Sequence, residues 1–200
     1  MSAFGSSTLG RTFPVEILTP SEVRALMSQC SRRGSCGFRD RALIATLFRA
    51  GLRVAELTAL APKDIDLATG EVRVLRGKGG KQRVVGVDTE TVALIELWMA
   101  QRVKLRVSKT APLFCTLRGG RLSRVQITQK LKELAAKAGI EKRVHPHALR
   151  HSRAVDLVRN GVALPTIQAA YGHSSLRTTQ VYVSHIAPAE VVEAMRGGSW

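Results

Sequence analysis

Apolar residues recur at helical spacing along most of this chain. Between residues 39 and 50, Leu43, Ile44, Leu47 and Phe48 fall on one face of a helix, because side chains three and four positions apart lie next to each other. Comparable patterns predict helices in most other parts of the chain. We expect them over residues 20–30, 53–60, 88–106, 123–138, 147–159, 165–171, 176–183 and 188–196.

Local signals mark several helix ends. Thr19 stands three residues before Glu22, an arrangement that predicts an N-cap with a capping box. Gly139 follows the last periodic residue of its helix, as a C-terminal glycine commonly does. Residues 31–37 are basic and contain glycine, so we expect a loop there before a helix that begins at Arg39.

The apolar spacing changes from helical to alternating between residues 65 and 87. Val72 and Val74 predict one strand, and the valines over 84–87 predict a second. The basic, glycine-rich segment 77–81 is expected to be the turn between them. The sequence therefore predicts an α+β protein that is mostly helical and carries a small antiparallel β-hairpin.

The chain shows no internal repeat and no second domain boundary. Residues 1–12 are rich in glycine, serine and threonine, so we expect a flexible N-terminal tail there and one domain over residues 13–200. Two hundred residues are enough for a sizeable core. No apolar run reaches about 18 residues, and the N-terminus lacks a signal-peptide pattern, so we expect neither membrane insertion nor secretion.

A strong positive charge points to an anionic partner. Lys and Arg total 31 against 15 Asp and Glu, which gives a formal charge of +16. Nucleic acid is the first expectation and a membrane surface the second. Aromatic residues make up only 4% of the chain, too few for a platform that stacks single-stranded bases. The charge therefore favours duplex DNA. Three cysteines without metal-type spacing indicate reduced thiols in a cytoplasmic setting.

Two cationic positions have local contexts that fit phosphate binding. Arg53 precedes Glu56 by about one helical turn, which would allow either a surface ion pair or a guanidinium held by the carboxylate for a phosphate. Lys78 stands among glycines in the expected hairpin tip, where it could be solvated or approach a DNA backbone. Lys81 competes with Lys78 for that role, and spacing does not choose between them.

A histidine and an arginine share one helix face further along. His147 and Arg150 lie three residues apart, and His147 follows Pro146 in the first helical turn, where free backbone N–H groups favour an anion. His145, His151 and Arg153 crowd the same region and leave the assignment open. A zinc site is the other reading, although no thiolate or carboxylate partners stand nearby. His173 and Tyr182, taken singly, are ordinary core residues.

Taken together, these residues resemble the tyrosine recombinase, or phage integrase, family. The matching motifs occur in the family's order from about Phe13 to Glu190, and the ordered set is far more specific than any single motif. They are Ala50-Gly-Leu-Arg-Val-Ala-Glu-Leu57, Gly77-Lys-Gly-Gly-Lys81, His145-Pro-His-Ala-Leu-Arg-His151, Tyr171-Gly-His-Ser-Ser175 and Thr178-Thr-Gln-Val-Tyr182.

The resemblance implies a site-specific recombinase or integrase and assigns six catalytic residues. These are Arg53, Lys78, His147, Arg150, His173 and Tyr182, so it selects Lys78 over Lys81 and His147 over His151. It implies that Tyr182 attacks a phosphate of double-stranded DNA to form a 3′-phosphotyrosyl link, without metal, nucleotide or other cofactor. It also implies a homo-oligomer, a tetramer on DNA, whose last helix over 188–196 either passes to a neighbouring protomer or packs on its own domain.

Two departures from the family pattern stand out. Tyr171 occupies a position that is usually aliphatic, which offers a second hydroxyl near the site, although its place before Gly-His favours a packing role. Family members also commonly carry a helical DNA-binding domain before the catalytic one, so we expect either a catalytic-domain fragment or a naturally short member. The alternative functions are a type IB topoisomerase-like enzyme and a non-catalytic basic DNA-binding protein.

Overall fold

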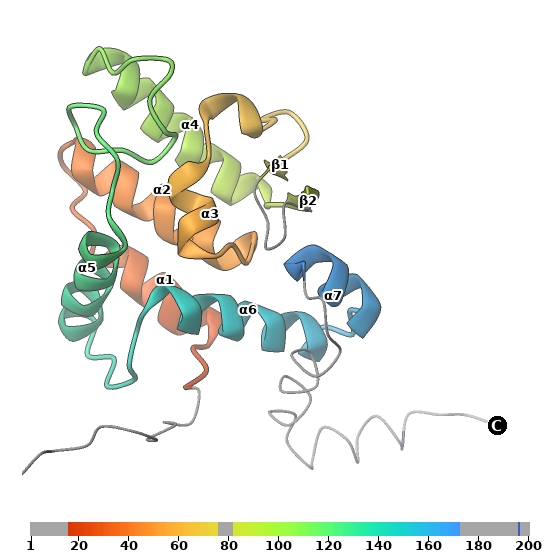
Figure 1. Ribbon diagram of the computed structural model, residues 1–200. Coiled ribbons are helices and arrows are strands. Elements are labelled where there is room, and N and C mark those ends of the chain that lie inside the picture. Colours follow the sequence, from red (N-terminus) through yellow and green to blue (C-terminus); the bar gives the residue numbers. More distant parts are fainter. Residues whose placement is uncertain (1–15, 76–81, 173–195, 197–200) are drawn as a thin grey trace, which may run out of the picture.

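A computed structural model describes residues 16–75, 82–172 and 196. Helices dominate it, and one two-stranded sheet lies between the third and fourth α-helices along the chain (Figure 1). The elements in order are α1 (Pro20–Ser28), α2 (Ser35–Arg49), α3 (Val54–Ala59), the 3-10 helix η1 (Pro62–Asp64), β1 (Glu71–Val74), β2 (Arg83–Gly86), α4 (Thr89–Lys104), α5 (Arg124–Lys137), α6 (Pro146–Arg159) and α7 (Leu164–Tyr171).

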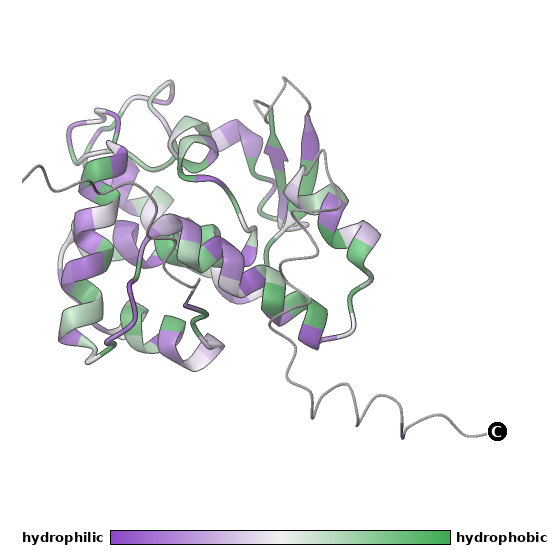
Figure 2. Ribbon diagram, turned by 60° about the horizontal axis from the view of Figure 1, so that its bottom comes forward, coloured by the Kyte–Doolittle hydropathy of each residue, from purple (hydrophilic) through white to green (hydrophobic). Residues whose placement is uncertain are grey.

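Helix α2 is the centre of the core. It packs against α1, α3, α4 and α6, and its Leu43, Ile44, Leu47 and Phe48 are all buried, as their spacing predicted. Figure 2 shows hydrophilic and hydrophobic positions alternating along the helices, as expected when each helix turns one face inward. None of the described helices is both long and apolar enough to cross a bilayer.

The expected hairpin is present. Strands β1 and β2 pair antiparallel with Val72 opposite Val85 and Arg73 opposite Val84. Val72 and Val85 are buried, whereas Val84 is exposed, so one face of the ribbon packs inward. The expected turn over 77–81 lies outside the described residues. The predicted fold class, mostly helical with a small antiparallel sheet, is confirmed.

Most of the expected helix ends agree with the structure. Thr19 caps α1 and forms the capping box with Glu22, while Asp88 and Ser123 cap α4 and α5. These side chains accept hydrogen bonds from backbone N–H groups that have no partner within the helix. The helices expected over 176–183 and 188–196 lie outside the described residues.

The expected start of α2 was wrong. The helix begins at Ser35 rather than Arg39, inside the stretch assigned to a loop. Glycine disfavours helices on average, but Gly37 packs directly against the backbone of Ser31, and a Cβ atom on it would lie 1.8 Å from the Ser31 carbonyl oxygen. The glycine is there because the helix passes too close to the preceding turn for any side chain.

A smaller apolar cluster joins α6 to α7. It contains Ala154 and Val155 of α6 with Ile167 and Tyr171 of α7, all of them buried. Helix α7 also contacts β2, so the end of α7 lies beside both the hairpin and α6 (Figure 1). This packing brings residues from β2, α3, α6 and α7 to one junction.

Candidate active site

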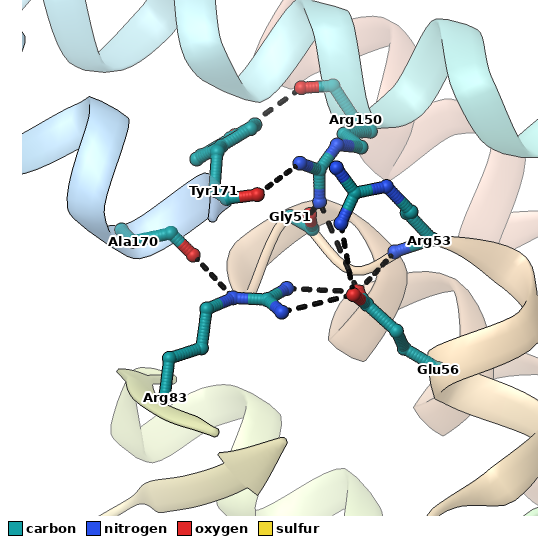
Figure 3. Close-up of polar contacts among 7 residues, drawn as sticks. All are labelled: Gly51, Arg53, Glu56, Arg83, Arg150, Ala170 and Tyr171. Carbon is teal, nitrogen blue, oxygen red and sulfur yellow. Dashed lines mark hydrogen bonds and ion pairs between the residues drawn. The ribbon is translucent and has the colours of Figure 1, made fainter. Parts of the chain in front are cut away.

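The carboxylate of Glu56 lies at the centre of this junction (Figure 3). Its Oε1 accepts hydrogen bonds from Arg53 Nη1 at 3.0 Å and Arg83 Nη1 at 2.9 Å. Its Oε2 accepts from the Arg53 backbone N–H and from Arg83 Nη2, both at 2.8 Å. The Glu56 side chain is only 3% exposed. Burial alone would raise the pKa of Glu56, but these hydrogen bonds and the charge of Arg83 hold the pKa below its usual value.

Arg53 is the N-cap of α3 and faces the cleft. The helix begins one residue later than expected, at Val54, because the Arg53 backbone is extended and its N–H group bonds to Glu56. The Arg53 side chain remains 31% exposed. Glu56 therefore holds one edge of the guanidinium group while the rest stays open to an incoming ligand, as the inward-aiming interpretation of this pair expects.

Arg150, on α6, is held more deeply. Its guanidinium donates to the Gly51 carbonyl oxygen and, at 2.7 Å, to the Tyr171 carbonyl oxygen, and it lies 3.9 Å from Glu56 Oε2. The Tyr171 ring packs against it with 4.4 Å between the guanidinium carbon and the ring centroid. Backbone contacts on two sides thus orient a cation that is only 2% exposed.

Gly51 makes this packing possible. Its φ of +58° lies in the left-handed region, and a Cβ atom there would stand 2.6 Å from the Tyr171 ring. Tyr171 in turn donates its hydroxyl proton to the Arg150 carbonyl oxygen at 3.2 Å. The second hydroxyl noted in the sequence is therefore buried in packing, which agrees with the expectation for a residue before Gly-His.

The crowded histidines occupy three different places. His145 caps α6, and its Nδ1 accepts a hydrogen bond from the Ala148 N–H. His147 lines the cleft, and its Nε2 lies 2.6 Å from Nε2 of the buried His151. Arg153 forms an ion pair with Asp156 on the same helix. Among the described residues, no group of three or more His, Cys, Asp or Glu side chains is arranged to hold a metal ion.

The environment of His147 favours its neutral form. Desolvation by the surrounding protein lowers the pKa of His147, and the positive charges of Arg150, His145, Arg53 and Arg124 lower it further. The ring is exposed toward the cleft, so it remains accessible even though protein atoms displace much of its water. A neutral imidazole at this position could accept a proton.

A cleft of about 620 Å³ opens over these residues. No acidic side chain lines it in the described part of the chain, and four arginines do. Arg53 and Arg150 come from the junction, and Arg124 and Arg143 stand on α5 and on the connection to α6. A cleft of this charge with low-dielectric walls attracts anions. The lining residues are Leu52, Arg53, Val54, Ala55, Arg124, Thr128, Arg143, His145, Pro146, His147 and Arg150.

The structure thus brings together three of the six residues assigned by resemblance, namely Arg53, His147 and Arg150. The other three, Lys78, His173 and Tyr182, lie outside the described residues. Sequence reasoning missed Arg83, which contacts Glu56 directly. The signal was available, because a period of two places Arg83 on the same strand face as the buried Val85. An arginine on an inward-facing position needs a buried partner.

Comparison with known proteins identifies close relatives. The phage integrase family pattern matches residues 16–188. The tyrosine recombinase XerC of Pelobacter propionicus is 38% identical over 172 residues, which cover 86% of this chain and 56% of the relative. The tyrosine recombinase XerD of Bifidobacterium longum is 35% identical over 199 residues, which cover 94% of this chain and 62% of the relative. The chain therefore spans about three fifths of the length of these curated relatives.

Solved structures agree with the fold and the family. The crystal structure of XerA recombinase superposes with a TM-score of 0.80 at 31% identity, covering 92% of this chain and 66% of that chain. The catalytic domain of bacteriophage HP1 integrase, 21% identical, superposes with a TM-score of 0.62 over 92% of this chain and 95% of that domain, which shows a shared fold. Because the family pattern covers most of its length, this chain belongs to the phage integrase family of tyrosine recombinases.

Proposed function

We propose that this chain is the catalytic domain of a site-specific recombinase that cleaves and rejoins duplex DNA through a phosphotyrosyl intermediate. The observation that carries the proposal is the cleft in which Arg53, His147 and Arg150 converge from α3 and α6, with no acidic side chain among the described residues that line it. The relatives named above are tyrosine recombinases, and a related structure is XerH recombinase bound to its difH substrate. We take residues 13–200 as the domain.

In the proposed reaction, the Tyr182 oxygen attacks the scissile phosphorus, and the 5′ oxygen of the next nucleotide leaves. The DNA then carries a 3′-phosphotyrosyl link and a free 5′-hydroxyl, and the reverse attack by a 5′-hydroxyl rejoins a strand. Charge gathers on the non-bridging phosphate oxygens during each step. Arg53 and Arg150 are rigid guanidinium donors held beside the cleft, so they are suited to neutralise that charge.

Proton transfers are assigned to the remaining residues. A phenol with a pKa of about 10 needs help to attack near neutral pH. His147 is suited to accept the proton because its environment keeps it neutral. Lys78 would protonate the departing 5′ oxygen, and His173 would donate a further hydrogen bond to the phosphate. The chemistry stores the bond energy in the covalent link, so the reaction needs no nucleotide.

Recombination also requires several protomers. We infer a homo-oligomer that assembles as a tetramer on two duplexes, with residues 188–196 passed to a neighbouring protomer, and a place of action on DNA in the cytoplasm. Deletion after Ser184, with cleavage and assembly measured separately, tests the role of this segment. Loss of assembly with retained cleavage supports exchange between protomers, whereas unchanged assembly contradicts it.

A nicked suicide substrate tests the main proposal. Wild-type protein should become covalently attached to the duplex, whereas Tyr182→Phe should bind the same duplex and form no adduct. An adduct that survives this substitution would remove Tyr182 from the role. The products then separate the alternatives: recombinant DNA indicates a recombinase, relaxed plasmid alone indicates a topoisomerase IB-like enzyme, and binding without any adduct indicates a non-catalytic DNA-binding protein.

A further inference from the structure

Arg83 connects three elements around the candidate active site. It is the first residue of β2, and its side chain is only 9% exposed. Its two terminal nitrogens bind the two oxygens of Glu56 at 2.9 Å and 2.8 Å, and its Nε donates to the Ala170 carbonyl oxygen at 2.7 Å (Figure 3). A planar fork bound on two edges has one orientation, so Arg83 fixes the Glu56 carboxylate relative to α7.

The charges of the junction are unequal. One carboxylate, Glu56, faces three guanidinium groups, those of Arg53, Arg83 and Arg150. Arg83 makes the closest pair with it and does not line the cleft, whereas Arg53 and Arg150 do. Arg83 can therefore neutralise the negative charge of Glu56 from the side that faces away from the cleft. Arg53 and Arg150 keep their net positive charge on the side where a phosphate would lie.

A bare carboxylate at the same place would work against the site. Glu56 lies within 3.9 Å of Arg150 and bonds to Arg53, so without Arg83 these two are the cations left to balance its charge in the part of the chain that the structure describes. It would also repel an anion that enters the cleft, because charges this close interact strongly in a partly buried site. Glu56 is needed to hold Arg53, and Arg83 reduces the repulsion that the Glu56 carboxylate would otherwise exert on an anion in the cleft.

Arg83 also shares the end of α7 with Arg150. The last carbonyl groups of a helix have no partner within it and carry the negative end of its dipole. Arg83 binds the Ala170 carbonyl oxygen, and Arg150 binds the next one, that of Tyr171. Two consecutive carbonyls thus tie the hairpin and α6 to the same helix end, which continues in the sequence to His173.

We propose that Arg83 is a positioning residue of this active site, which neutralises Glu56 and orients it so that Arg53 and Arg150 present their charge to the scissile phosphate. This role rests on the proposed function. It differs from the roles of the six residues assigned by resemblance, because Arg83 acts through Glu56 and the α7 carbonyl and not by contact with DNA.

The test compares a charged with a neutral scissile group. Single-turnover adduct formation is measured on two nicked duplexes, one with the normal phosphate and one with a methylphosphonate at the scissile position. The variants are Arg83→Gln and Arg83→Lys, and the control is Arg102→Lys. Arg102 is likewise buried and donates to backbone carbonyls, those of Leu113, Ala111 and Ser108, away from Glu56. Duplex affinity and melting temperature are measured for every protein.

We expect Arg83→Gln to slow adduct formation on the phosphate by about 100-fold, comparable to the loss of one transition-state donor, with little change in duplex affinity. The loss should shrink to about tenfold or less on the neutral methylphosphonate, where less charge needs to be neutralised. Arg83→Lys should lie between Arg83→Gln and wild type on the phosphate, because it keeps the charge but not the fork. Arg102→Lys should affect both substrates equally.

The outcomes separate the two proposals. If wild-type protein forms no adduct on the phosphate, the proposed function fails and this inference fails with it. If wild-type protein reacts and Arg83→Gln stays within about threefold of it, or loses the same factor on both substrates, the positioning role alone is overturned. Should Arg83→Gln fail to fold, the same criteria apply to Arg83→Lys.

Discussion

The Nε2 atoms of His147 and His151 lie 2.6 Å apart, with their rings nearly perpendicular. At this separation one nitrogen donates a proton and the other accepts it. Both rings cannot be doubly protonated without placing two N–H groups against each other. The tautomers of the two rings are therefore coupled: the ring that donates carries its proton on Nε2, and the ring that accepts carries its proton on Nδ1. The His-Ala-Leu-Arg-His spacing alone did not reveal this coupling.

A pH dependence of stability follows from the desolvation of His147 and the positive charges of the arginines around it. The pKa of His147 is lowered in the folded protein from an ordinary value of 6.5, so below that pH the unfolded chain binds a proton that the folded chain does not. Stability should therefore fall as the pH drops through 6.5. Urea unfolding at pH 7.5 and pH 5.5 should show a smaller pH effect in His147→Gln than in wild type. Equal pH effects in both proteins would contradict the assignment.

Gly51→Ala should disturb the packing of Tyr171. The substitution places a methyl group 2.6 Å from the ring and forces a side chain into a left-handed backbone conformation. Gly161→Ala is the matched control, since Gly161 also has positive φ but open space around it. We expect Gly51→Ala to cost about 1–3 kcal/mol more unfolding free energy than Gly161→Ala. Equal losses in urea unfolding would mean that backbone strain alone matters.

Glu56→Gln keeps the shape of the side chain and removes its charge. The buried guanidinium group of Arg83 would then lose the carboxylate that binds it on two nitrogens, so we expect a loss of about 3 kcal/mol in unfolding free energy at pH 7. Because the pKa of Glu56 is lowered, its stabilising charge is present above pH 4.5 and disappears as the pH falls through the folded-state pKa. The difference between wild type and variant should therefore shrink in acid.

The control for this variant is Glu133→Gln. Glu133 pairs with Lys130 in a similar i,i+3 arrangement but on an exposed face of α5. Exposed pairs contribute little, so this change should lower the unfolding free energy far less than Glu56→Gln does. If Glu133→Gln lost as much unfolding free energy as Glu56→Gln, the buried ion pairs of the junction would stabilise the protein no more than an exposed pair.

Arg124 and Arg143 line the cleft beyond the junction and are expected to contact DNA phosphates. Replacing either by Gln should weaken duplex binding at all sequences and reduce the slope of log Kd against log salt concentration by about one. Lys130→Gln is the matched control, because Lys130 lies on α5 with Arg124 but lines a different pocket. A slope that changes equally in all three variants would indicate diffuse attraction rather than contacts from the cleft.

Periodicity and capping signals were sufficient to predict most of the fold. The largest difference, the start of α2, depends on the close approach of Gly37 to Ser31, which no local pattern encodes. For the site, the motifs singled out Arg53 and Arg150, but their convergence on Glu56 arises because α3 and α6 both pack on α2, with Gly51 and Tyr171 against the Arg150 guanidinium. Spacing also could not separate the capping role of His145 from the cleft position of His147.

The shared carboxylate has a consequence for how the protein opens. Glu56 of α3 binds Arg83 of β2, and Arg83 in turn binds the end of α7. If the hairpin detaches, a buried charge loses its partner and a helix end loses its hydrogen bond at the same time. Backbone amides of β2 and α7 should therefore exchange with solvent deuterium in a single cooperative step, with one shared opening free energy.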